Sequence, residues 1–116
     1  MKRKARARIR QQYQAEYPNP IQVKADERVE VGQEDEDWPG WLWCRANGRE
    51  GWVPIELLSE DRPLAVALAD YSANELAVEA REEVEIEETR HGWARVRNAR
   101  GEVGWIPESH IGDQWE

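Results

Sequence analysis

The 116-residue chain contains an internal repeat, in which the order Gly-Trp, turn, Gly-Trp, aliphatic residue and proline occurs twice. The first copy spans residues 41–54 and the second spans residues 93–107. In the first copy Asn47-Gly48 lies between two short alternating runs. This dipeptide favours a β-hairpin, because both central residues of a type I′ turn need a positive φ. The repeat therefore predicts two copies of one small folded unit.

The similarity between the two copies continues outside the hairpins. Tyr13 corresponds to Tyr71, and the alternating residues 29–31 correspond to residues 84–86. The first copy is longer near residues 16–19 and near residues 33–39. Insertions are tolerated far better in loops than in strands, so both places are predicted to be loops.

Each repeat has about five short segments of period-2 alternation separated by turn-rich stretches, a pattern typical of a small all-β barrel. We predict two five-stranded barrels in tandem. The first domain is residues 1–59 with a basic N-terminal arm, and the second is residues 63–116 with a short tail. Residues 5–12 read as an edge strand, with Ala7 and Ile9 on one face. The short linker predicts contact between the two modules.

The charge is unevenly distributed along the chain. The net charge is −8, and because residues 1–10 carry six cations and no acid, the rest of the chain carries −14. Such an arm can contact nucleic acid or an acidic partner. Alternatively, it is a solvated tail, or a first strand that pairs with the acidic body. The acidic body repels phosphate, so a nucleic-acid partner is not expected.

Composition and motifs argue against several other classes of protein. The single cysteine, Cys44, excludes an internal disulfide and aligns with Val96, so it is expected in the core. The apolar runs are too short for a spanning helix and no signal peptide is evident, which predicts a cytoplasmic protein without membrane association. We find no catalytic constellation, metal-ligand cluster or cofactor motif. We therefore expect no enzyme activity, and the sequence alone does not set an oligomeric state.

Motifs in the second repeat resemble the SH3 family, and they occur in the family's order. Residues 67–71, Ala-Leu-Ala-Asp-Tyr, resemble the Ala-Leu-Tyr-Asp-Tyr signature, and residues 75–78 resemble the strand that closes the RT loop. Gly92-Trp93 matches the tryptophan after the n-Src loop, and residues 104–111 match the segment Gly-aromatic-aliphatic-Pro-Ser-Asn-Tyr-Val. The first repeat, with its long acidic loop, is more similar to the variant SH3 domains of bacterial proteins.

The resemblance implies peptide binding, because aromatic rings between the RT and n-Src loops of SH3 domains receive a polyproline II helix. The implied site residues are Tyr71, Glu75, Trp93, Trp105, Pro107 and His110 in the second repeat, and Tyr13, Trp41, Trp52 and Pro54 in the first. Two of the family's tyrosines are replaced in each repeat, by Ala69 and His110 in the second and by Gln11 and Leu57 in the first. These changes reshape one of the two proline pockets.

The second repeat is the better candidate for a ligand groove. Glu75 stands at the position of the family's carboxylate that pairs with a basic ligand residue, and Glu87 and Glu88 add negative potential. We therefore predict binding of an extended, basic, proline-containing peptide or partner protein. For Trp52 and Trp105, packing within the protein is as consistent with the sequence as contact with a ligand, because tryptophan is a good strand residue with a large apolar area. The alternative for the whole chain is a structural unit whose grooves are covered.

Overall fold

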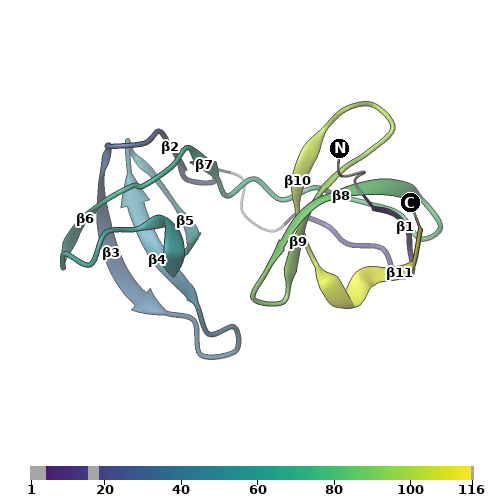
Figure 1. Ribbon diagram of the computed structural model, residues 1–116, viewed down its shortest axis with the longest axis horizontal. Coiled ribbons are helices and arrows are strands. Elements are labelled where there is room, and N and C mark those ends of the chain that lie inside the picture. The colour runs from purple at the N-terminus through teal and green to yellow at the C-terminus, as the bar shows by residue number, and fades with distance from the viewer. Residues whose placement is uncertain (1–4, 16–18, 116) are drawn as a thin grey trace. The chain divides into compact units, whose positions relative to one another are not determined.

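The computed structural model describes residues 5–15 and 19–115 and is built from short strands and two 3₁₀ turns (Figure 1). The predicted all-β class is confirmed. The strands are β1 (Arg6–Ile9), β2 (Gln22–Val23), β3 (Arg28–Glu34), β4 (Trp41–Ala46), β5 (Arg49–Pro54), β6 (Leu64–Val66), β7 (Tyr71–Ser72), β8 (Glu83–Arg90), β9 (Trp93–Arg97), β10 (Val103–Pro107) and β11 (Ile111–Trp115). The 3₁₀ turns are η1 (Ile55–Leu57) and η2 (Glu108–His110).

The described residues form two compact units, which we call the terminal unit and the central unit. The terminal unit combines residues 5–15 with residues 75–115, and the central unit is residues 19–74. The terminal unit has a five-stranded sheet of order β10-β9-β8-β1-β11. The central unit has a four-stranded sheet of order β5-β4-β3-β6 and the small sheet β2-β7. The predicted loop near residues 33–39 joins β3 to β4, whereas most of the loop predicted near residues 16–19 lies outside the described residues.

The two repeats exchange their first strands. β1, from the first repeat, lies between β8 and β11 of the second repeat (Figure 1). β6, from the second repeat, pairs with β3 of the first. The segments that come after these strands in the sequence lie in the same units as the strands. Tyr13, after β1, pairs with Val78 in the terminal unit, and β7, after β6, pairs with β2 in the central unit. The expected boundaries at residues 1–59 and 63–116 follow the sequence repeat, so they do not coincide with the compact units.

The connection between the repeats explains why β6 lies in the central unit. Leu58 lies opposite Ala67, and the Ser59 N–H donates to the Val66 carbonyl at 2.9 Å. The Ser59 hydroxyl also accepts a hydrogen bond from the Val66 N–H at 2.9 Å. The linker therefore closes an antiparallel hairpin onto the first repeat. Closing a short loop costs less chain entropy than recruiting a strand that is distant in sequence.

Each hydrophobic core contains residues of both repeats. The central core is formed mainly by the first repeat, around Ile21, Val29 and Val53, and also holds Ala65 and Ala67. The terminal core is formed mainly by the second repeat and also holds two β1 residues; its members are Ala7, Ile9, Leu76, Val78, Val84, Ala94, Val96 and Ile106. Burial of this apolar surface is the main stabilisation available to barrels of this size.

The predicted alternation in the first strand is confirmed, but its predicted place at a sheet edge is wrong. Ala7 and Ile9 are buried, whereas Arg6 and Arg8 are exposed. β1 is an interior strand because it pairs with β8 on one side and β11 on the other. Arg6 Nη1 lies 3.7 Å from Glu83 Oε1, and Arg10 Nη2 donates a hydrogen bond to the Ser109 carbonyl at 2.8 Å. Pairing of the basic arm with the acidic body is thus seen from residue 6; Lys2, Arg3 and Lys4 lie outside the described residues.

Cys44 lies in the central core, as predicted, and its thiol is expected to be inert in the folded chain. The side chain is fully buried, and this burial raises the pKa of the thiol from 9.0 to about 12. Only the thiolate is alkylated. At pH 8 we expect iodoacetamide to react about a thousandfold more slowly with folded than with urea-unfolded protein, from the three-unit difference in pKa. Mass spectrometry measures both rates, and similar rates would contradict the burial.

Candidate functional site

Three aromatic rings meet on the terminal unit, and we call Tyr13, Trp93 and His110 the aromatic cluster. The ring of Tyr13 stands edge-on to Trp93, with centroids 5.9 Å apart and planes at 82°. It also stands edge-on to His110, at 5.3 Å and 81°. Edge-to-face pairs of this kind add to the stabilisation from burial. Tyr13, from the first repeat, is therefore the centre of a cluster whose other members come from the second.

The carboxylate of Glu75 is held beside this cluster. The Tyr13 hydroxyl donates to Glu75 Oε1 at 2.6 Å. The backbone of Glu75 forms a bridge to Trp105, and the Leu76 N–H donates to the Trp105 carbonyl at 3.2 Å. Strand β10 thus fixes the backbone of Glu75, and Tyr13 orients its side chain.

The local backbone explains how Trp93 and His110 reach the cluster. Trp93 begins β9 directly after the turn at His91 and Gly92, whose φ values are 44° and 88°. His91 is exposed in this turn, as expected for a loop residue. His110 ends η2, and its Nδ1 lies 3.1 Å from the Gln11 carbonyl and 3.0 Å from the Gln12 carbonyl. Because carbonyl oxygens only accept, Nδ1 is the protonated nitrogen in this arrangement.

The structure corrects which tyrosine belongs to which group of predicted site residues. Tyr13 was expected with Trp41 in the first repeat, and Tyr71 was expected with Trp93 in the second. Instead, Tyr71 lies in the central unit, where its hydroxyl donates to the Trp52 carbonyl at 2.7 Å. The two tyrosines have exchanged places because each follows an exchanged first strand.

The predicted tryptophans and prolines differ in exposure. Trp93 and Trp52 are half-buried, whereas Trp41 and Trp105 are each only 4% exposed. Pro54 and Pro107 are buried at the ends of β5 and β10, next to the two 3₁₀ turns. Of the residues predicted for ligand contact, the structure brings together Tyr13, Glu75, Trp93 and His110 on the terminal unit. On the central unit it brings together Tyr71 and Trp52.

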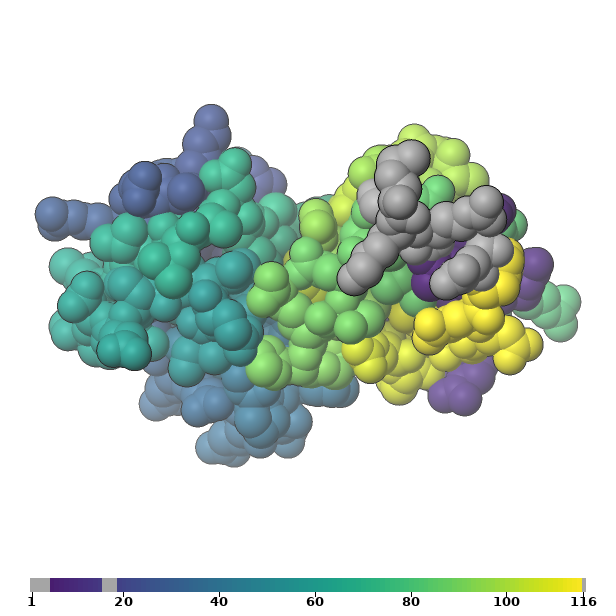
Figure 2. Space-filling view, viewed as in Figure 1, coloured from purple at the N-terminus to yellow at the C-terminus, as the bar shows by residue number. Residues whose placement is uncertain are grey.

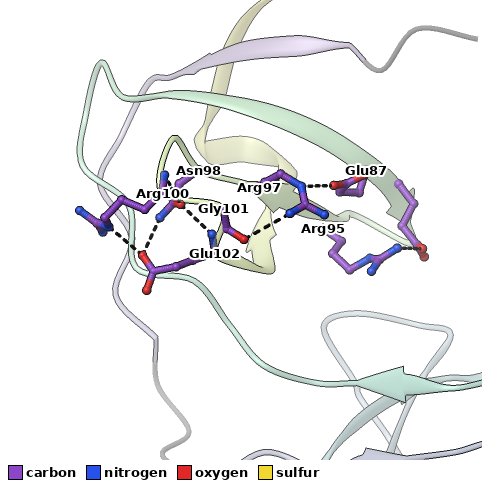
Figure 3. Close-up of polar contacts among 8 residues, drawn as sticks. Glu87, Arg95, Arg97, Asn98, Arg100, Gly101 and Glu102 are labelled. Carbon is purple, nitrogen blue, oxygen red and sulfur yellow. Dashed lines mark hydrogen bonds and ion pairs between the residues drawn. The ribbon is translucent and has the colours of Figure 1, made fainter.

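Glu87 and Glu88 do not supply the free negative potential that the sequence suggested, because arginines neutralise them. Figure 3 shows Glu87 with its arginine partner, Arg97. Arg97 pairs with Glu87 at 2.8 Å. Arg95 Nη2 lies 2.9 Å from Glu88 Oε2, and Arg90 Nε lies 2.6 Å from Oε1 of the same carboxylate. Glu87 and Glu88 lie on β8, and Arg95 and Arg97 extend from the neighbouring β9. Glu75 is thus the carboxylate in contact with the aromatic cluster.

A second aromatic surface lies on the central unit, where Trp52, one of the predicted site residues, pairs with Trp43, which was not predicted to accompany it. Trp43 and Trp52 face each other across β4 and β5, with ring centroids 5.0 Å apart and planes at 72°. The signal was present in the sequence, because the hairpin turn at Asn47-Gly48 sets the register that places these two residues opposite one another.

Residues 5–15 and 19–115 contain no group of His, Cys, Asp and Glu side chains arranged to hold a metal ion. Within the same residues, no helix has the length and apolar character needed to cross a membrane.

The structure thus has two small β barrels in tandem, and one of them carries an aromatic cluster beside a carboxylate. The variant SH3 domain family matches residues 6–61, and the bacterial SH3 domain family matches residues 67–113. The chain therefore belongs to the SH3 family and carries two SH3 domains in tandem. SH3 domains are in general protein-interaction modules.

One curated relative is the SH2/SH3 adapter protein dreadlocks of Drosophila melanogaster, to which the chain is 24% identical over 125 residues. The match covers 89% of this chain but 22% of the relative, so the chain spans about a fifth of that protein's length. No solved structure gives a significant match.

Proposed function

We propose that the chain is a non-catalytic interaction module that binds an extended segment of a partner protein, with proline and basic residues, at the aromatic cluster of the terminal unit. The observation that carries the proposal is the contact of Tyr13 with three groups at once: its ring meets Trp93 and His110, and its hydroxyl bonds Glu75. This places flat apolar rings next to one carboxylate. The match to an adapter protein supports the same class of function.

The chemistry of these groups suits such a ligand. The edges and faces of aromatic rings contact an extended chain at low entropic cost, because a polyproline II segment is already ordered before it binds. A carboxylate at the side of the rings attracts a cation and orients it. With Gln11 and His110 in place of two of the family's tyrosines on the terminal unit, the contact area is reduced. We therefore expect micromolar or weaker affinity.

The exchange of tyrosines makes this proposal testable. The probe is a synthetic proline-rich peptide with two arginines, titrated into isotopically labelled protein while amide and indole shifts are followed by NMR. Trp93→Ala should abolish binding, because it removes the largest ring. Tyr13→Phe should weaken binding about three- to tenfold, because Glu75 loses the hydroxyl that orients it.

Tyr71→Phe is the matched control, since it removes the same hydroxyl at the equivalent place in the other repeat. It should leave peptide affinity unchanged and cost the central unit about 1 kcal/mol, because the bond to the Trp52 carbonyl is lost. If Tyr71→Phe weakens binding and Tyr13→Phe does not, the cluster is not the binding site. Absence of shifts around Trp93 at millimolar peptide would favour a structural role for the chain.

A further inference from the structure

The outer face of β6 carries a row of apolar side chains. Along β6 and the two residues after it, Ala65 and Ala67 are buried in the central core. The residues that alternate with them, Leu64, Val66 and Leu68, point away from this core. We call these three residues the β6 strip. The hairpin that contains them lies on the surface of the central unit, where it is teal in Figure 2.

The β6 strip is exposed to a degree that large apolar side chains elsewhere in the structure are not. Within residues 5–15 and 19–115, the exposed large apolar side chains are Ile55, Leu64 and Leu68, at 42%, 52% and 58%. Two of them belong to the strip, and the third lies on η1, which precedes the same hairpin. In β1, the other exchanged strand, the outward residues are Arg6 and Arg8. Contiguous exposed apolar surface marks places where another molecule packs.

The backbone of β6 is already paired on both sides. β6 pairs with β3 on one side. On the other side Val66 exchanges two hydrogen bonds with Ser59, each at 2.9 Å, and the Leu68 N–H donates to the Leu57 carbonyl at 2.8 Å. An extended peptide therefore cannot add to β6 as a further strand. A partner contacts the outer side chains instead, which suits the surface of a folded protein.

The charges beside the β6 strip form a pattern that is complementary to itself. Arg28 and Glu30 lie on β3, opposite the strip, and both are exposed. In the part of the chain that the structure describes, neither has a hydrogen bond or ion pair through its side chain. Arg45, the cation next to Glu30, is paired with Glu50 instead. If two such surfaces pack around a twofold axis, Arg28 of each copy faces Glu30 of the other.

We propose that the β6 strip is a contact surface for a second copy of this chain, packed around a twofold axis. A twofold interface requires a surface that complements itself, and an apolar strip bordered by one cation and one anion meets this requirement. Three side chains per copy form a contact well below the roughly 1,000 Å² of a stable complex, so we expect a dissociation constant of about 1 mM. The proposal does not rest on the proposed function, because none of these residues belongs to the aromatic cluster.

The first test follows the amide resonances of isotopically labelled protein by NMR during dilution from about 2 mM to about 50 μM, a range that brackets the expected affinity. The amides of residues 28–30 and 64–68 should shift saturably with concentration. Leu64→Gln/Leu68→Gln should abolish these shifts, and the variant is expected to fold because both side chains are more than half exposed. Amides that do not respond to dilution, or shifts that persist in the double variant, would overturn the proposal.

Charge variants test the twofold arrangement. Arg28→Glu gives each copy two acids beside the strip, and Glu30→Arg gives each copy two cations. Either variant alone should associate about three- to tenfold more weakly than the parent, as for two exposed ion pairs replaced by like charges. An equimolar mixture of the two variants should regain the parent's association, because each acid then faces a cation. Since the chain carries a net charge of −8, both variants remain negative, and nonspecific attraction does not explain such a recovery.

Arg81→Glu is the matched control, because it makes the same change of charge as Arg28→Glu at an exposed position of the terminal unit. Its self-association should stay within about twofold of the parent, since distant surface charges are screened. Equal weakening by Arg28→Glu and Arg81→Glu would show a general effect of charge and overturn the proposal. A mixture of Arg28→Glu and Glu30→Arg that associates no better than either variant alone would rule out the twofold contact.

Discussion

Replacement of Ala7 with aspartate is expected to unfold the terminal unit, although Ala7 belongs to the first repeat. Ala7 is fully buried in the terminal core beside Val84. An unpaired carboxylate there costs several kcal/mol, which is comparable with the roughly 3–8 kcal/mol that stabilises a unit of this size. Amide hydrogen exchange should therefore lose protection in residues 75–115 and keep it in residues 19–74.

Ala65→Asp is the reciprocal variant, because Ala65 belongs to the second repeat and is buried in the central core. It should remove protection from residues 19–74 and spare residues 75–115. If each barrel were instead formed by one contiguous repeat, the loss of amide protection would fall in the other barrel for both variants. Ala7→Gly provides a milder change of about 1 kcal/mol, too small to force the strands to rearrange. In Ala7→Gly the loss of amide protection should again lie in residues 75–115. A loss in residues 19–58 would rule out the exchange of first strands between the repeats.

Replacement of Gly104 with alanine is the second change for which we expect a large effect. A Cβ at this position would lie 2.7 Å from the Leu76 backbone nitrogen and 2.8 Å from the Glu75 carbonyl carbon. Both contacts are with backbone, so no side-chain rotation relieves them. We expect destabilisation of the terminal unit on the order of 3 kcal/mol, measured by urea unfolding. Because the backbone of Glu75 must move, binding of the proline-rich peptide should weaken as well.

Gly101→Ala is the control within the same unit. Its φ is 84°, but no atom lies within 4 Å of the added Cβ. The cost should therefore be only the backbone strain of a left-handed conformation, about 1 kcal/mol, with no change in peptide binding. Equal costs for the two glycine variants would contradict the close packing of β10 on the backbone at Glu75 and Leu76.

Most residues of the candidate site could be predicted from motifs, but their grouping could not. Trp93, His110 and Glu75 occupy the positions that the SH3 resemblance implied. The motif could not show that Tyr13 accompanies them, because Tyr13 and Tyr71 have the same local context in the two repeats. It also could not show that arginines on β9 neutralise Glu87 and Glu88, since cross-strand pairing depends on register.

The sequence by itself determined the all-β class, the two hairpins, the loop after β3 and the burial of Cys44. These features depend on local alternation, turn residues and side-chain size, which are the same in any arrangement of the strands. Which barrel receives each first strand was decided only in the tertiary structure. Residues 5–9 and residues 63–67 have similar small apolar residues on one face, so the local pattern does not distinguish which sheet each segment completes. The short linker closes a hairpin at low entropic cost, which places β6 beside β3 and leaves the position between β8 and β11 for β1.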